Sequence, residues 1–351
     1  MGLYFIKPNT TFDFVGRRYQ ALIFSGCIIL AGIIALIMRG GPQFGIDFAG
    51  GIIAQLKLDK PVEVAALNKV LTDLKLPSLA IQRIGSEMDN SFLLRIGEIQ
   101  ATAESLRQDI DNILAKSLPD VKHELQRFEM VGPKVGGDLR GKALQALLYS
   151  VLCMAVYISG RFENRWWTAS TIAVVLGTAM YFLDRLGVPV PWMTLFAMVI
   201  SHVLWFKLRL TYSLGAMISL VHDVVITVGI FAILGKEIDL TVVAALLTIV
   251  GYSMNDTIIV FDRIRENVKK KADKSFDLLI NRSINETLSR TILTSSTVLL
   301  VVLCLYLFGG SAIHNFAFAL LVGVIVGTYS SIFVASPVLL AFVPHQEELI
   351  A

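Results

Sequence analysis

Two carboxylates stand within apolar stretches that are long enough to cross a membrane. Asp223 lies at the middle of the run 212–234, and Asp256 lies close to the end of the run 240–261. A charged side chain at such a depth costs at least about 2.5–3.5 kcal/mol, so it faces a protein interior and is a candidate for function. A carboxyl group in this setting either exchanges protons or makes a hydrogen bond between helices.

The neighbours of Asp223 form a polar face on its predicted helix. Gly215, Ser219, Asp223 and Thr227 recur every four residues, which places them on one side of the helix. We favour proton exchange over a purely structural hydrogen bond for Asp223. His222 lies about 100° round the helix, so we expect it to stay outside the Asp223 site. For His222 a structural hydrogen bond and a proton relay both stay open.

A second polar cluster is expected around Asp256. Asn255 precedes it directly, and Arg290 begins the next apolar run, which enters the membrane from the same side. The first two turns of that run are rich in hydroxyl side chains: Thr291, Thr294, Ser295, Ser296 and Thr297. We predict an ion pair between Asp256 and Arg290 that holds the carboxylate ionised until a proton or a movement releases it. The alternative is that Arg290 only anchors the helix end at the membrane surface.

The composition excludes an ordinary soluble protein. Of the 351 residues, 55% are hydrophobic and 17% are charged, whereas about a quarter of the residues of a soluble domain are charged. The formal net charge of +3 gives no basic field that would attract nucleic acid. The three cysteines lie in apolar runs, without a CxxC motif or a His/Cys cluster. We therefore expect an integral membrane protein without a metal, a cofactor or a nucleic-acid partner.

Eight apolar runs reach or approach the roughly 20 residues that a membrane-spanning helix needs. They are 19–38, 142–160, 166–183, 192–206, 212–234, 240–261, 291–308 and 316–343. Lys and Arg gather in the short loops on one side, above all between the sixth and seventh runs, and the positive-inside rule places that side in the cytoplasm. Both termini are then predicted to be cytoplasmic, which agrees with an even number of spans.

Residues 40–140 have a soluble composition and are predicted to lie outside the cytoplasm. Period and turn signals predict strands over 52–58, 79–84, 92–96 and 121–130, with a polar turn at 87–90, and helices over 62–74 and 102–117. The order β-α-β-β-α-β is that of a ferredoxin-like unit. Such a sheet leaves one face open for docking, and a merely structural cap explains it equally well.

These elements predict four parts along the chain. A cytoplasmic N-terminus and the first transmembrane helix occupy residues 1–39, and the extracytoplasmic domain occupies 40–140. A transmembrane bundle follows over 141–345, and 346–351 form a cytoplasmic tail. The first apolar run lacks a cleavage site for a signal peptidase, so we expect it to stay as a membrane anchor.

Several motifs closely resemble the SecF branch of the SecD/SecF family of protein-export membrane proteins. GIDFAGG at 45–51 contains Gly45, Asp47, Gly50 and Gly51, and VGPKVG follows at 131–136. LVHD at 220–223, GYSMNDT at 251–257 and SRTILTS at 289–295 continue the resemblance. FDRIREN at 261–267 adds Asp262 and Arg263. The His-Asp and Tyr-Ser-x-Asn-Asp motifs in one short chain favour the SecF branch over SecD.

The resemblance implies an α-helical polytopic membrane protein of the resistance-nodulation-division (RND) type, with six family spans and one extracytoplasmic α+β ferredoxin-like domain. It implies a subunit of the bacterial inner membrane that pairs with SecD, docks on the SecYEG channel and uses the proton gradient to move the translocating polypeptide. Carried onto this chain, the family's proton-coupling residues match Asp256 and Arg290, with Asp223 nearby and a carboxylate of SecD supplied in trans. Asn255 and His222 belong to the same motifs.

One departure from the family pattern concerns residues 161–206. A family member is expected to pass directly from the second span to the segment around 213–215, whereas here two further apolar segments intervene. We expect an inserted helical hairpin that faces lipid, because two extra crossings return the chain to the cytoplasm.

Other function classes receive less support. No complete GxxxxGK[ST] nucleotide loop is present, so the energy has to come from an ion gradient or from a partner's ATPase. A scaffold that stabilises SecD or the channel without conducting protons is the main alternative. An RND-type exporter of small molecules or lipids would need about twice the spans, and the absence of GxSxG and HExxH motifs argues against a membrane hydrolase.

Overall fold

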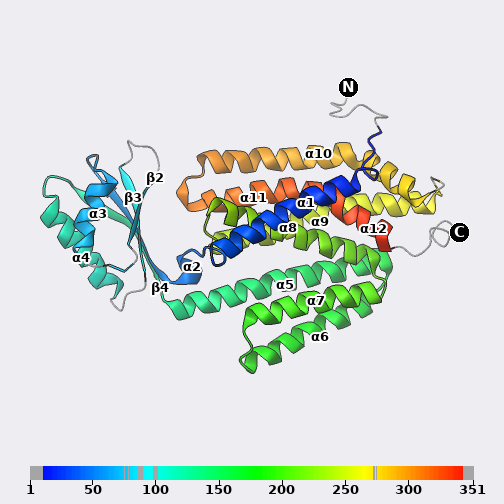
Figure 1. Ribbon diagram of the computed structural model, residues 1–351, viewed down its shortest axis with the longest axis horizontal. Coiled ribbons are helices and arrows are strands. Elements are labelled where there is room, and N and C mark those ends of the chain that lie inside the picture. The colour runs from blue at the N-terminus through cyan, green and yellow to red at the C-terminus, as the bar shows by residue number, and fades with distance from the viewer. Residues whose placement is uncertain are drawn as a thin grey trace.

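The computed structural model describes residues 11–74, 76–77, 79–84, 90–97, 102–271, 273 and 275–342. A small sheet domain lies at one end of a bundle of long helices, and we call the other end of the bundle the distal end (Figure 1). The first ten residues, residues 87–89 of the predicted turn at 87–90, and the predicted tail at 346–351 lie outside the described residues.

Eight helices within the described part of the chain are long and apolar enough to cross a membrane, which confirms the eight predicted spans. They are α1 (Arg18–Met38), α5 (Pro133–Glu163), α6 (Trp166–Arg185), α7 (Val190–Lys207), α8 (Thr211–Leu234), α9 (Leu240–Lys269), α10 (Phe276–Phe308) and α11 (Ser311–Ser330). The last span continues from α11 through the π-helical turn η2 (Ser331–Ala335) into α12 (Ser336–Phe342). The chain is therefore a multi-pass membrane protein.

Two helices continue well beyond their apolar runs at the distal end. The predicted span of α9 stops at Phe261, but the helix continues to Lys269. The predicted span of α10 starts at Thr291, but the helix already begins at Phe276. Hydropathy marks only the part of a helix that is apolar all round. The extensions are amphipathic, and they bury Ile264, Leu279 and Ile280 against the bundle.

The sheet domain has the predicted order β-α-β-β-α-β. Its elements are β1 (Gly51–Leu58), α3 (Val64–Thr72), β2 (Ala80–Ile84), β3 (Ser91–Ile96), α4 (Ala103–Ser117) and β4 (His123–Val131). The strands form one antiparallel sheet in the order β2-β3-β1-β4. Alternate residues of β1, from Ile52 to Leu58, are buried against α3 and α4, as expected for a sheet that is covered on one face. The other face of the sheet is turned toward the bundle (Figure 1).

The GIDFAGG segment joins the sheet domain to the bundle. The Gly45 N–H donates to the Ile238 carbonyl at 2.9 Å, and the segment then forms the short helix α2 (Ile46–Ala49). The Oδ2 atom of Asp47 accepts the Leu240 N–H at 2.9 Å, so this carboxylate caps the first turn of α9. Gly51 has a φ of 120°, and a Cβ atom there would lie 2.7 Å from the Ile96 carbonyl oxygen. Asp47 and Gly51 thus have structural reasons to be present in the motif.

The predicted hairpin consists of α6 and α7. It packs against α5 through a separate apolar cluster that includes Leu148, Leu176 and Met193, and α7 also contacts α8. The hairpin lies at the edge of the bundle, whereas α10 lies on the opposite side (Figure 1). The hairpin therefore leaves the α9–α10 side of the bundle uncovered.

The fit between α2 and α5 provides a test of this joint. A Cβ atom on Gly136 of α5 would lie 3.0 Å from the Phe48 carbonyl oxygen, whereas a Cβ atom on Gly137 would have no neighbour within 4 Å. Because backbone atoms cannot move aside cheaply, we expect Gly136→Ala to destabilise the protein by about 1–3 kcal/mol. Thermal unfolding of the purified protein in detergent measures the change.

The matched control is Gly137→Ala, which adds the same methyl group one residue further along the same helix. It should leave the unfolding temperature unchanged or raise it slightly, since alanine favours a helix more than glycine does. Equal unfolding temperatures for the two variants would contradict the proposed joint.

Candidate functional site

Asp256 lies where α9, α10 and α11 meet. Its side chain is fully buried, and Oδ2 accepts a hydrogen bond from Ser295 Oγ of α10 at 3.1 Å. Ser295 Oγ in turn accepts a hydrogen bond from Thr328 of α11 at 2.7 Å. The second carboxylate oxygen, Oδ1, is buried and has no hydrogen-bond partner among the described residues. Asp256 is thus a carboxyl group with one oxygen free for a proton or for another donor.

Close packing of α11 on α9 brings these hydroxyl groups to the carboxylates. A Cβ atom on Gly323 would collide with the side chain of Ile249, and one on Gly327 would lie 3.0 Å from the Cβ atom of Ser253. Small residues of this kind let two membrane helices approach closely. The approach places Thr328 within reach of Ser295, and it places the neighbouring turn of α11 beside α8.

Asp223 occupies a separate cluster between α8, α9 and α11. Its Oδ2 atom accepts hydrogen bonds from Ser253 at 2.6 Å and from Ser330 at 2.9 Å. Its Oδ1 atom lies 2.9 Å from Nδ1 of His222. Asp223 is fully buried, and both of its oxygens have partners. This carboxyl group therefore joins three helices, which is the structural alternative considered for it.

The prediction that His222 lies outside the Asp223 site is wrong. The two Cα–Cβ bonds diverge by about 100°, but side chains of this length can turn back and meet across that angle. The His222 ring is mostly buried and stacks on Tyr329, with ring centroids 6.2 Å apart. Tyr329 donates a hydrogen bond to the Ala21 carbonyl at 2.6 Å, which extends the cluster to α1.

The predicted ion pair between Asp256 and Arg290 is not present in this conformation. No ion pair of Arg290 within 4.0 Å is found in the described part of the chain. Arg290 lies about 7.5 Å closer to the distal end of α10 than Ser295, at about 1.5 Å per residue. It lines a polar pocket of about 450 Å³ that is also lined by Asn255, Asp262 and Glu286. The pocket leads from the distal end toward the turn that carries Asp256.

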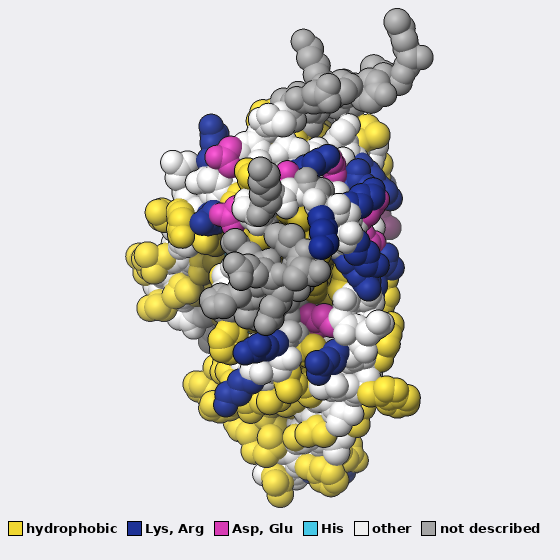
Figure 2. All heavy atoms as spheres, turned by 90° about the vertical axis from the view of Figure 1, so that its right-hand side faces the viewer, with side chains coloured by type: hydrophobic (Ala, Val, Ile, Leu, Met, Phe, Trp, Pro, Cys, Tyr) yellow, Lys and Arg dark blue, Asp and Glu magenta, His cyan; other side chains and the backbone are white. Residues whose placement is uncertain are grey.

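Asp262 and Arg263 hold the distal ends of three helices together. Asp262 accepts a 2.5 Å hydrogen bond from Arg161 of α5. Arg263 donates to Glu286 of α10 at 2.6 Å and to Glu266 at 2.7 Å. Lys and Arg side chains gather on this end of the molecule, with acidic side chains among them (Figure 2). The motif that follows Asp256 thus fixes α9 against α5 and α10.

Glu163 is a structurally important residue that we did not find from the sequence. It ends α5, and its Oε1 atom accepts the Tyr212 N–H in the first turn of α8 at 2.9 Å. Its Oε2 atom accepts hydrogen bonds from Ser159 at 3.0 Å and from Ser213 at 3.1 Å. Glu163 therefore caps α8 and joins the two ends of the α6–α7 hairpin. Tyr212 follows Glu163 by 49 residues, so no local sequence pattern indicates this contact.

A stripe of small and polar residues runs along the exposed side of α9. Ala244, Thr248, Gly251 and Asn255 are exposed, and they follow one another at helical spacing. We call these four residues the α9 stripe. Polar groups that face hydrocarbon are costly, so such a stripe indicates contact with another membrane helix. Among the described residues, no group of three His, Cys, Asp or Glu side chains could hold a metal ion.

These features define a class of protein: a multi-pass helical membrane protein with a ferredoxin-like domain at one end and buried carboxylates among its spans. The family model described as "Protein export membrane protein SecD/SecF, C-terminal" matches residues 111–182 and 189–345. The model described as "SecD/SecF GG Motif" matches residues 35–62. The chain belongs to the SecD/SecF family. The break in the first match, at 183–188, covers the end of α6 and part of the turn to α7.

Relatives and solved structures agree with this assignment. The chain is 39% identical over 334 residues to a "Protein translocase subunit SecF" of Calditerrivibrio nitroreducens, covering 94% of each chain. It is 38% identical over 351 residues to the subunit of that name from Magnetococcus marinus, covering 99% of this chain and 96% of the relative. The crystal structure of SecDF from Thermus thermophilus, titled a translocon-associated membrane protein, matches with a TM-score of 0.67 and 30% identity. That match covers 95% of this chain and 39% of the longer SecDF chain.

Proposed function

We propose that this chain is the SecF-type subunit of a Sec protein-export complex, which couples proton movement to the passage of a polypeptide across the bacterial inner membrane. The observation that carries the proposal is Asp256, a buried carboxyl group beside the exposed α9 stripe, with one oxygen that has no hydrogen-bond partner among the described residues. The names of the relatives support the export role. The subunit acts as a transport protein rather than as an enzyme, and it needs no cofactor.

Proton coupling follows from two environments available to Asp256. In the environment seen here, its carboxyl group accepts a hydrogen bond from Ser295 and lies away from Arg290. In the other, the ionised carboxylate pairs with Arg290, and loss of the pair accompanies uptake of a proton. One charge that crosses the whole membrane potential contributes about 2.3 kcal/mol per 100 mV. That energy biases two conformations by more than about tenfold, which is enough to move the sheet domain between two positions.

A SecD-type partner is proposed to cover the α9 stripe. Lipid offers few hydrogen-bonding groups to the exposed amide of Asn255 and to the exposed Arg290. A helix of the second subunit would supply such groups, together with a carboxylate in trans. The α6–α7 hairpin packs on α5 and α8, so it leaves this side free. We propose that the resulting pair docks on the SecYEG channel and contacts the translocating polypeptide.

The orientation that we propose places the distal end and both termini in the cytoplasm. The short loops at the distal end are rich in Lys and Arg, as the positive-inside rule requires. The sheet domain then lies outside the cytoplasm, where it can meet an emerging polypeptide.

A scaffold without proton conduction remains the second candidate. The Asp223 cluster favours it, because there a buried carboxyl group serves to join helices. An RND-type exporter subunit for small molecules or lipids receives no specific support from the geometry.

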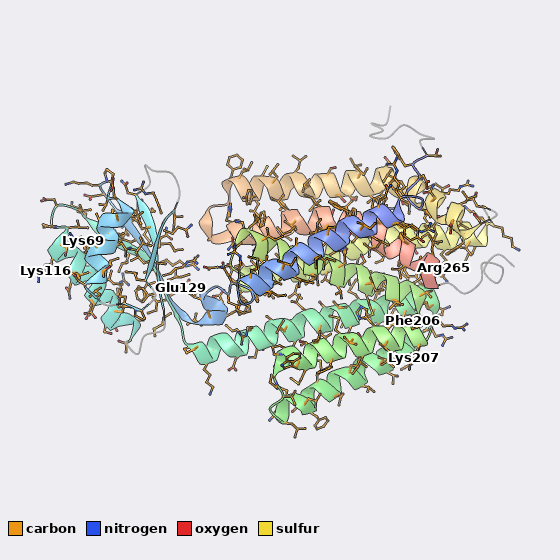
Figure 3. The ribbon with its side chains drawn as sticks, in the orientation of Figure 1. Lys69, Lys116, Glu129, Phe206, Lys207 and Arg265 are labelled. Carbon is orange, nitrogen blue, oxygen red and sulfur yellow. The ribbon has the colours of Figure 1, made fainter. Side chains whose placement is uncertain are left out.

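Thiol labelling tests the orientation. The three native cysteines are first replaced by serine, and a single new cysteine is then introduced. Lys69→Cys places it in the sheet domain, and Lys207→Cys places it at the distal end (Figure 3). An impermeant thiol reagent added to intact cells, after the outer membrane has been permeabilised, should label Lys69→Cys. It should label Lys207→Cys only after the inner membrane has been opened. Equal labelling of both positions in intact cells would contradict the orientation.

Bulk added to the α9 stripe tests the partner. A Cβ atom on Gly251 would meet no described residue within 4 Å, so Gly251→Leu should fold and yet obstruct a partner helix. Overpacking of the interface should weaken binding of the SecD-type subunit by about 1–3 kcal/mol and reduce its copurification about fivefold or more. Gly26→Leu is the matched control, because Gly26 lies exposed in α1 and also has open space around it. Loss of the partner from both variants, or from neither, would refute the assigned interface.

The proton-coupling role is tested by Asp256→Asn, which keeps the shape of the side chain and removes its proton exchange. In inverted membrane vesicles that contain the SecD-type subunit, the imposed proton gradient should no longer accelerate export of a preprotein. The loss of the gradient-dependent rate should be about tenfold or more, while the complex stays assembled. Arg290→Lys should retain part of the stimulation, since a positive charge remains.

Asp184→Asn is the control for this experiment, because Asp184 is exposed at the end of α6, far along the chain from the Asp256 site. It should respond to the gradient like the unmodified protein. Full gradient stimulation of Asp256→Asn would establish the scaffold role in place of proton coupling.

A further inference from the structure

A cavity of about 810 Å³ lies between the sheet domain and the bundle, outside the site described above. Strands β2 and β3 form one wall, and the loop between α8 and α9 forms another. The ends of α10 and α11 that point toward the sheet domain complete it. The charged and aromatic residues that matter for its chemistry are Arg83, Arg95, Lys236, Glu237 and Tyr306.

The cavity has more positive than negative groups. Arg95 is paired with Glu237, whereas Arg83 and Lys236 have no carboxylate partner among the described residues. The Nε atoms of Arg83 and of Arg95 are buried without a hydrogen-bond acceptor in the described part of the chain. Burial lowers the pKa of Arg95, while the charge of Asp239 raises it less. Arg83 also donates to the Val62 carbonyl at 3.0 Å, and Lys236 lies 4.7 Å from the centre of the Phe318 ring. Two guanidinium groups and one ammonium group thus line a cavity whose only described carboxylate, that of Glu237, is paired with Arg95.

The position of the cavity indicates the surface of the membrane. The spanning helix α10 ends at Phe308, and α11 begins three residues later at Ser311. Leu307 lines the cavity and is 62% exposed, and Leu303 is exposed one turn further into the span. An apolar track therefore runs from the cavity along α10 into the hydrocarbon.

We propose that this cavity binds the phosphate head group of an anionic glycerophospholipid from the leaflet on the sheet-domain side. Guanidinium groups match the geometry of phosphate oxygens and are weakly hydrated, so they suit a half-buried phosphate. The volume lies in the range of about 300–1,000 Å³ that is usual for small-molecule sites. The adjoining apolar track favours a lipid over free phosphate, because it accommodates the acyl chains. The bound lipid joins the sheet domain to the bundle at a point where the Arg95–Glu237 pair links β3 to the α8–α9 loop.

Native mass spectrometry of the full chain, or of its complex with the SecD-type subunit, tests the proposal. The probes are phosphatidylglycerol and phosphatidylcholine with identical acyl chains, added to the delipidated protein. The unmodified protein should retain phosphatidylglycerol in preference. The double variant Arg83→Gln, Lys236→Gln should reduce that preference about tenfold or more. The double variant Lys69→Gln, Lys116→Gln removes the same charge on the far side of the sheet domain and should retain the preference (Figure 3).

A variant with the opposite expected effect guards against misfolding of the double variant. Glu237→Gln removes the only carboxylate of the cavity lining among the described residues and should strengthen retention of phosphatidylglycerol severalfold. Unchanged lipid preference in the Arg83/Lys236 variant would overturn the proposal. Equally tight binding of soluble glycerol 3-phosphate would overturn its assignment to a lipid.

Discussion

The cost of placing a carboxylate in hydrocarbon governs the arrangement of this bundle. Asp223 and Asp256 can remain at that depth only if neighbouring helices supply hydrogen bonds or if a proton neutralises them. Three hydroxyl-bearing helices meet the requirement, because α9, α10 and α11 place Ser253, Ser295 and Ser330 around the two carboxyl groups. The glycines of α11 permit the approach, so the packing of small residues and the chemistry of the site have one physical origin.

The two helices that carry these carboxyl groups are fixed by carboxylates from distant segments. Asp47 caps the first turn of α9 beside the sheet domain, and Glu163 caps the first turn of α8 at the distal end. A negative charge at a helix N-terminus also interacts favourably with the helix dipole. Hydrogen bonds therefore join α2 to the helix that carries Asp256 and the end of α5 to the helix that carries Asp223. Under the proposed coupling, a change at Asp256 would reach the sheet domain through Asp47.

The sequence predicted the spans, the ferredoxin-like order and the two intramembrane carboxylates, because hydropathy and period are local signals. It did not predict the distal extensions of α9 and α10, since their buried face is visible only when the partner surface is known. The contact between His222 and Asp223 was missed because a helical wheel ignores side-chain length. The Asp256–Arg290 ion pair was expected because both residues were predicted at the same depth in the membrane. The structure shows Asp256 hydrogen-bonded to Ser295 instead. Glu163 escaped detection because its partner lies beyond a whole helical hairpin.

Infrared difference spectroscopy of the reconstituted complex tests the central claim most directly, because it detects the protonated carboxyl group itself. Our account predicts a carboxyl band that appears and disappears as the pH changes, and that is missing from Asp256→Asn but present in Asp223→Asn. A spectrum in which no band depends on Asp256 at any pH would show that this residue does not exchange protons, and it would contradict the account.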